Sequence, residues 1–243
     1  MRAGFTAALV VALLLPSLAA AQDLSLSLGE GGSISARSIQ LILLITVLSL
    51  APGLAIMITC FPFLVTVLAI LRQGIGLQQS PPNMLIVSLA LFLTYFIMEP
   101  VFAEAWRTGI EPMMDETLGV EPAMERAIVP FKAFMAARVD ADTFHSMMVL
   151  RPEAEAFGLS SDAPISVLIP SFMLSEIARA FQIGFLIFLP FLIIDLVVAA
   201  VLMSMGMMMV PPATVALPFK LAFFVIADGW SLIAGALVRS YVS

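Results

Sequence analysis

A cluster of methionines near the C-terminal end is the most distinctive chemical feature of this sequence. Five of seven consecutive residues are methionine, and a Pro-Pro pair follows them: Met203, Met205, Met207, Met208 and Met209. Thioether side chains are flexible and polarizable, so they adapt to irregular surfaces. One interpretation is adaptable packing inside a core. The other is a ring of soft side chains, one set per subunit, that closes an opening and reseals around a passing chain. The residues alone leave both interpretations open.

Ionisable residues interrupt the apolar runs of the C-terminal third at Asp195, Lys220 and Asp228. Charges within apolar helices are costly, so each is expected to face a partner, a cavity or water. The carboxylates would suit a small-solute or ion transporter. The alternative is that Lys220 neutralises a carboxylate on a neighbouring helix or subunit and so specifies assembly. Tight subunit packing is favoured by small residues at every fourth position, which let helices approach closely: Ala227, Ser231 and Gly235.

The usual signatures of catalysis are absent from the sequence. It has no phosphate-binding glycine loop ending in Lys-Ser/Thr, no His-Glu-x-x-His and no Cys-x-x-Cys. His145 is the only histidine and Cys60 the only cysteine, so neither a metal site nor a nucleophile-base pair can be assembled around them. Cys60, with apolar neighbours, is interpreted as a small core residue. We therefore expect no enzyme activity, no cofactor and no metal.

The composition decides the class of protein. Hydrophobic residues make up 61% of the chain and charged residues 12%, with a mean hydropathy of +1.09. Such a chain cannot cover its own apolar surface, so its helices must face lipid or partner subunits. The net charge of -6 comes from residues 104–162, and no basic cluster exists to bind nucleic acid. We predict an all-α membrane protein with two kinked, Pro-broken apolar helical hairpins that flank a small water-facing helical domain.

The N-terminus has the pattern of a secretory signal. Arg2 precedes an apolar stretch from Ala7 to Leu15, and three alanines, 19–21, offer a small-residue cleavage site. The alternative, an uncleaved first anchor, is disfavoured because the apolar run is shorter than the roughly 20 residues of a span. The predicted organisation is a signal peptide, a flexible linker, an apolar hairpin, an acidic helical domain and a second apolar hairpin with the methionine loop: 1–21, 22–37, 38–103, 104–163 and 164–243.

The first hairpin begins with an uncharged stretch from Ser38 to Leu71. As one helix it would be about 51 Å long, which exceeds a hydrocarbon core of roughly 30 Å. We expect Pro52-Gly53 and Pro62 to break it into two or three pieces. A polar turn then leads into a second apolar arm, Met84 to Met98.

The acidic domain has the spacing of amphipathic helices. Glu121-Pro122 predicts a helix start, and Asp140 or Asp142 is expected to cap the next helix. One buried face is predicted from two triplets at i, i+3, i+4: Phe131, Phe134 and Met135, then Phe144, Met147 and Met148. Its five bases favour the cytoplasm, whereas the signal and two spans favour the periplasm. We adopt the periplasmic side because a translocated N-terminus fixes the start.

Long motifs over most of the chain resemble the FliP family of the flagellar type III export gate, whose relatives occur in virulence injectisomes. The matching segments are Ser80-Pro81-Pro82-Asn83, residues 89–94, Ser175-Glu176-Ile177, residues 181–185 and the continuous stretch 189–230. Two places depart from the family pattern. A Cys60-Phe61-Pro62-Phe63 segment replaces the usual Ser-Phe-Thr-Arg, and Ala178-Arg179 stands where a lysine directly follows Ile177.

The resemblance implies a gated conduit for unfolded flagellar proteins, built from copies of this chain, five by similarity, and from other small export-gate membrane subunits. It places the chain in the bacterial inner membrane, at the flagellar basal body, in contact with lipid. It implies that Met207, Met208 and Met209, and also Met205, line the constriction. From the residues themselves we expect Glu176, Asp195, Lys220 and Asp228 to be buried charges that serve assembly. An injectisome export-gate homologue is the alternative within this class, and the cleavable signal and the sizeable domain favour the flagellar form.

Overall fold

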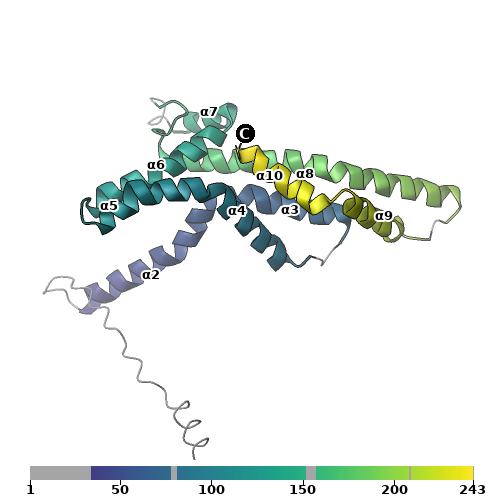
Figure 1. The fold of residues 1–243 in the computed structure, drawn as a ribbon, viewed down its shortest axis with the longest axis horizontal. Helices are drawn as coiled ribbons and strands as arrows, with labels where there is room; N and C mark the ends of the chain where they lie inside the picture. The colour runs from purple at the N-terminus through teal and green to yellow at the C-terminus, as the bar shows by residue number, and fades with distance from the viewer. Residues whose placement is uncertain (1–33, 78–80, 152–156, 208, 243) are drawn as a thin grey trace, which may run out of the picture. The chain divides into compact units, whose positions relative to one another are not determined.

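The structure, a computed structural model, describes residues 34–77, 81–151, 157–207 and 209–242. The predicted signal peptide and most of the predicted linker lie outside these residues. The chain divides into two units, Met1–Ser49 and a compact unit Leu50–Ser243. Every regular element in the described ranges is a helix, which confirms the all-α class (Figure 1): α2 Ile34–Met57, α3 Phe61–Ile75, α4 Asn83–Ala105, η1 Trp106–Ile110, α5 Glu111–Met114, α6 Val120–Arg138, α7 Ala141–Val149, α8 Ile165–Ser204, α9 Pro212–Ile226 and α10 Gly229–Val242.

The long uncharged stretch is broken once. Helix α2 ends at Met57 and α3 begins at Phe61, with Pro62 in its first turn, where the missing proline N–H has no helical partner to lose. The predicted break at Pro52-Gly53 is wrong, because both residues lie inside α2. A proline within an apolar helix costs one backbone hydrogen bond and is tolerated. Helix α2 also begins at Ile34, so the last four residues of the predicted linker are helical.

Helices α3 and α4 pack against each other as a hairpin. Arg72, in the last turn of α3, donates to the backbone oxygen of Pro81 at 3.4 Å and to the side-chain oxygen of Asn83, the first residue of α4. Gly76 ends α3 with a left-handed φ of 88°, a conformation that glycine adopts without steric cost. One basic side chain and one glycine thus fix the two ends of the turn.

The main core is built around α3. Its inner face is fully buried, with Phe63, Leu64 and Leu71 at 0% exposure, and it packs most extensively on α8. The two helices approach closely at Gly184, where an added Cβ would lie 2.4 Å from the Cδ1 of Ile70. Side chains from α4, α8, α9 and α10 complete this core. The hairpins therefore share one interior.

The acidic region, residues 104–163, follows its predicted pattern. Helix α6 begins at Val120, next to Glu121-Pro122, and Asp140 caps α7 by accepting a hydrogen bond from the backbone N–H of Thr143 at 3.0 Å. That N–H and the Thr143 hydroxyl hold the pKa of Asp140 below its ordinary value. A second small core joins α6, α7 and the start of α8, including Met135, Val139, Phe144, Leu168 and Phe172.

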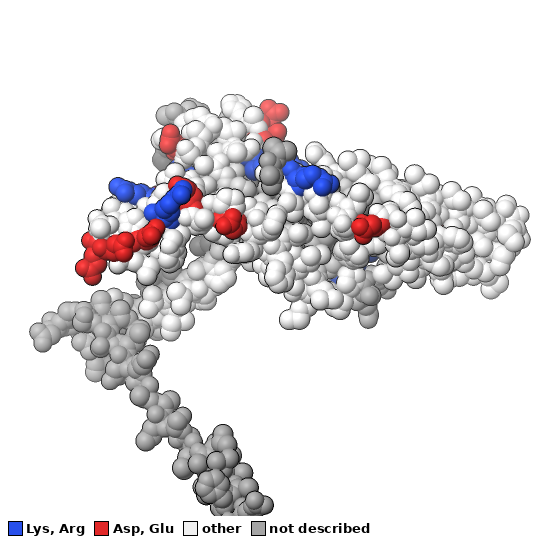
Figure 2. Space-filling view, viewed as in Figure 1, with Lys and Arg blue, Asp and Glu red and all other residues white. Residues whose placement is uncertain are grey.

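Several helices are long and apolar enough to cross a membrane: Ser38–Met57, Asn83–Met114 and Ile165–Ser204. A fourth crossing would need α9 and α10 together, which are bent by 61°. Helix α8, with 40 residues, is about 60 Å long, roughly twice a hydrocarbon core. Charged side chains gather on the visible face over the acidic region, and the far end of α8 and α9 is nearly free of them (Figure 2). The chain is a membrane protein.

Candidate functional site

The methionine cluster forms the turn between α8 and α9. Helix α8 ends in a Schellman motif, in which the N–H of Gly206 donates to the oxygen of Met203 and the N–H of Met207 donates to the oxygen of Leu202. Gly206 has a φ of 74°, the left-handed conformation that this motif requires. Pro211 and Pro212 then start α9. Backbone hydrogen bonds therefore fix where the methionines project.

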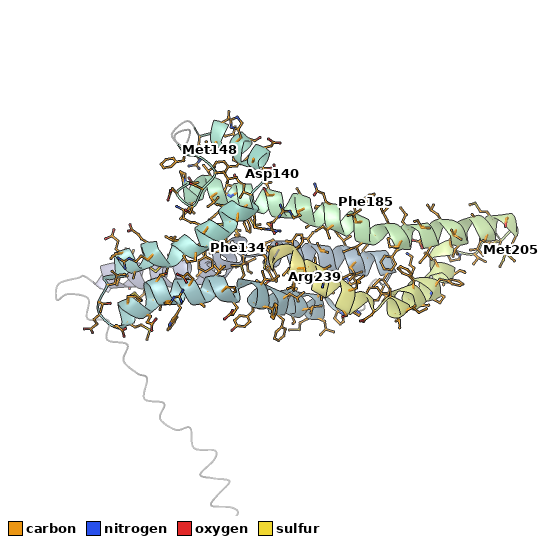
Figure 3. The ribbon with its side chains drawn as sticks, turned by 45° about the horizontal axis from the view of Figure 1, so that its top comes forward. Phe134, Asp140, Met148, Phe185, Met205 and Arg239 are labelled. Atoms are coloured by element: carbon orange, nitrogen blue, oxygen red, sulfur yellow. The ribbon has the colours of Figure 1, made fainter. Side chains whose placement is uncertain are left out.

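The methionine side chains of this turn are exposed. Met203, Met205 and Met207 are 63%, 66% and 42% exposed and Met209 is 98% exposed, while Met208 lies outside the described residues. Figure 3 shows Met205 at the extreme end of α8, away from the main core. These thioethers do not fill a gap in the interior of their own chain.

An apolar groove of about 440 Å³ runs beside the turn, between α8 and α9. Its wall carries no polar side chain and consists of Ile193, Ile194, Val197, Val198, Val201, Leu202, Val215 and Phe219. The exposed turn and the open groove together leave this end of the chain with unsatisfied apolar surface.

Lys220 joins three helices. Its Nζ lies 2.6 Å from the Oδ2 of Asp195 on α8 and donates at 3.0 Å to the oxygen of Gly74 in the last turn of α3. A cation at a helix C-terminus is favourable because the last carbonyls of the helix are unpaired and carry partial negative charge. Lys220 is 6% exposed, and the Oδ1 of Asp195 is buried without a hydrogen-bond partner among the described residues. Lys220 and Asp195 thus neutralise each other within one chain.

Asp228 is placed differently from the other two charges. It is exposed, has a left-handed φ of 46° and lies in the break between α9 and α10. Ala227 is the C-cap of α9, so of the three small residues only Ser231 and Gly235 share a helix. Their role in helix packing stays a prediction. The Asp228-Gly229 pair, a common turn dipeptide, is the signal in the sequence that marks this break.

Glu176 is the centre of a second ionic cluster. Its carboxylate is fully buried, lies 3.2 Å from the Nε of Arg138 on α6 and 3.5 Å from Arg179, and accepts a hydrogen bond from the Tyr241 hydroxyl on α10. Arg179 stands three positions after Glu176, so the displaced basic residue still reaches the carboxylate.

Sequence reasoning missed Arg138 and Tyr241. Arg138 donates to the backbone oxygen of Ser240 at 2.8 Å, and its guanidinium carbon lies 3.9 Å from the centroid of the Tyr241 ring. These residues are separated from Glu176 by 38 and 65 positions, and no local pattern pairs them. The cluster ties the acidic region to both arms of the C-terminal hairpin.

The two single-copy residues have no site around them in the described chain. His145 is exposed on α7. Cys60 is fully buried, and burial raises the pKa of its thiol to about 12. Among the residues that the structure describes, no group of three His, Cys, Asp or Glu side chains is arranged to hold a metal ion.

Comparison with known proteins identifies the family. The family model described as "FliP family" matches residues 44–237. The chain belongs to the FliP family. The flagellar biosynthetic protein FliP of Caulobacter vibrioides is 48% identical over 96% of this chain and 88% of its own length. Those of Bacillus subtilis and Aquifex aeolicus are 45% and 42% identical, over 84% and 90% of this chain and 92% and 91% of theirs.

Membership in the FliP family makes the chain a component of the flagellar type III export apparatus, as the resemblance implied. The long apolar helices agree with a role in a membrane. The methionine turn, the Lys220 pair and the Glu176 cluster all fall within the matched residues or directly beside them.

Proposed function

We propose that this chain is an export-gate subunit that forms a ring with copies of itself, five by the resemblance, and with other small membrane subunits of the flagellar basal body in the inner membrane. The ring conducts unfolded flagellar proteins. The observation that carries the proposal is the exposed methionine turn at the end of a 40-residue apolar helix in a chain of this family.

Burial arguments support the ring. About 60 Å of apolar α8 exceeds a hydrocarbon core of roughly 30 Å. The helices of its own chain leave Leu186, Leu196 and Val197 exposed on α8, and sister chains would cover what lipid does not. The groove between α8 and α9 offers an apolar receptor surface next to the turn. Sister chains would bring several methionine turns together at one end of the assembly.

The gate is then closed by the flexible methionine side chains, which pack against one another. Met205, Met207, Met208 and Met209 from each copy close the opening, because unbranched thioethers can pack against one another without a fixed polar contact. A passing chain displaces them and they reseal behind it. The subunit catalyses nothing in this proposal, and the energy for export comes from elsewhere. Its acidic region lies on the periplasmic side.

Replacing the described gate methionines tests this function. Met205, Met207 and Met209 are changed together to alanine, and the permeability of cells to a small fluorescent solute is measured with swimming motility. The smaller side chains should leave the opening unsealed, so solute entry should rise while the assembled complex is still purified. Met84→Ala is the matched control, because Met84 is an exposed methionine on α4. Equal permeability in the triple variant and the control would overturn the gate.

A further inference from the structure

One face of α4 exposes a row of aromatic side chains. Residues spaced by three, four and seven positions share a face of a helix. The aromatic residues of this face lie on α4, except the last, which is the first residue of η1. Their exposed fractions are between 37% and 75%: Phe92, Tyr95, Phe96, Phe102 and Trp106. Exposed aromatic clusters of this size are typical of protein interfaces.

Glu99 lies in the middle of this row. It is exposed and makes no hydrogen bond or ion pair with any described residue. A carboxylate surrounded by apolar side chains on a candidate membrane helix is costly unless a cation meets it. This face of α4 is therefore expected to pack against an apolar surface that carries one positive charge level with Glu99.

The chain itself supplies one such cation. Among the basic side chains that the structure describes, five are already bonded: Arg72, Arg107, Arg138, Arg179 and Lys220. Three more lie in the acidic region: Arg126, Lys132 and Arg151. Arg239 remains, exposed on the apolar helix α10 without an ion pair to any described residue. Its guanidinium lies over Gly235, where an added Cβ would come within 3.2 Å of Nη1.

The two faces also match in register. On α4, Phe92 and Tyr95 precede Glu99 by seven and four positions. On α10, the exposed Leu232 and Ala236 precede Arg239 by seven and three positions. Parallel packing sets Phe92 beside Leu232, the Tyr95 ring over the small residue Ala236, and the carboxylate beside the guanidinium. Large side chains over small ones are how apolar helices approach closely.

We propose that the aromatic face of α4 in one copy packs in parallel against the Leu232, Ala236 and Arg239 face of α10 in the next copy, with Glu99 paired to Arg239 of that copy. Each copy presents both faces, so the contact is heterologous, the type of contact from which a closed ring of identical copies is built. This inference rests on the proposed ring and names the surfaces that build it.

Disulfide trapping tests the contact in the full-length protein in membranes. Tyr95→Cys and Ala236→Cys are combined in one chain and oxidised, and a ladder of cross-linked multimers is expected on a non-reducing gel. The native Cys60 is buried and contributes no background. The matched control combines Tyr95→Cys with His145→Cys, an exposed position on α7, and should give no ladder.

Charge reversal tests the ion pair. Glu99→Arg and Arg239→Glu should each lower the yield of intact multimer about tenfold, since like charges then face each other. The double reversal should return the yield to within about threefold of the original. Glu125→Arg, which reverses an exposed and unpaired carboxylate on α6, should leave the yield unchanged.

The outcomes separate this contact from the ring itself. If the native chain forms multimers but shows no ladder and tolerates both reversals, the contact is wrong and the proposed function stands. If Glu99→Arg removes other membrane subunits and leaves the copy-to-copy ladder intact, the face binds a different partner and the inference is overturned. If the native chain is monomeric in purified complexes, the proposed ring itself fails.

Discussion

Lys220 shows how single residues tolerate charge inside this apolar protein. The ammonium has two acceptors, the Asp195 carboxylate and the Gly74 carbonyl, so the cost of burying it is offset by local bonds. The same principle applies to Glu176, whose carboxylate accepts hydrogen bonds from Arg138 and Tyr241 and forms an ion pair with Arg179. Both charges join helices that are distant in sequence, so each also fixes how those helices meet.

Removing the Lys220 charge alone should destabilise the fold. Lys220→Met leaves the Asp195 carboxylate without its cation, and we expect a loss of about 2 kcal/mol in unfolding free energy, reduced from the fully buried case because Asp195 is one-third exposed. Lys220→Met combined with Asp195→Leu should recover most of this loss. Thermal unfolding in detergent measures both variants. Equal stability of the single and double variants would contradict the pairing.

Residue-scale predictions succeeded where the signal was local. The predicted cap, Asp140 or Asp142, is Asp140, which acts within one helical turn of Thr143. The pairing of Arg179 with Glu176, three positions away, was not predicted. Arg138 and Tyr241 escaped prediction because they meet Glu176 only after α6, α8 and α10 have packed together. The charge of Lys220 was identifiable, but its carbonyl acceptor at the end of α3 was not.

At the scale of elements, the end of α8 coincides with a glycine, Gly206. The left-handed Gly206 completes the Schellman motif that ends α8 and begins the turn that presents the methionines. Proline plays the weaker part, since Pro52, Pro170 and Pro190 all lie inside helices. The sequence therefore predicted the hairpins well and their breaks less well, because apolar packing decides which prolines interrupt a helix.

Two glycine substitutions compare Gly206, which has a left-handed φ, with Gly53, which lies inside α2. Gly206→Ala should lower the unfolding free energy by about 1 kcal/mol, because a Cβ is strained at a φ of 74°. Gly53→Ala, inside α2 and with no atom within 4 Å of an added Cβ, should be neutral or stabilising by up to about 1 kcal/mol. Unfolding in detergent should place Gly206→Ala below the native protein in stability and Gly53→Ala level with it or above it. Equal effects would exclude a special role for the Gly206 turn.

At the scale of the whole molecule, exposed apolar surface governs behaviour. Within the compact unit, α4, α8 and α9 each expose large apolar side chains, including Phe92, Phe185 and Phe219. A single copy cannot cover these surfaces, so its stability depends on lipid and on other subunits. Composition alone predicted this dependence. Composition could not predict which helix face contacts which partner, because that depends on which side of each helix is already buried in the core.

Cysteine labelling tests the predicted side of the acidic region. Two spans after a translocated N-terminus put α7 in the periplasm and the α3–α4 turn in the cytoplasm. His145→Cys, exposed on α7, should react with a membrane-impermeant maleimide in intact cells, and Gln73→Cys, exposed near the turn, should react only after lysis. Cys60 should not react with the maleimide, because burial and a thiol pKa of about 12 leave little accessible thiolate. The opposite labelling pattern would place the region in the cytoplasm, on the side that its five bases favour.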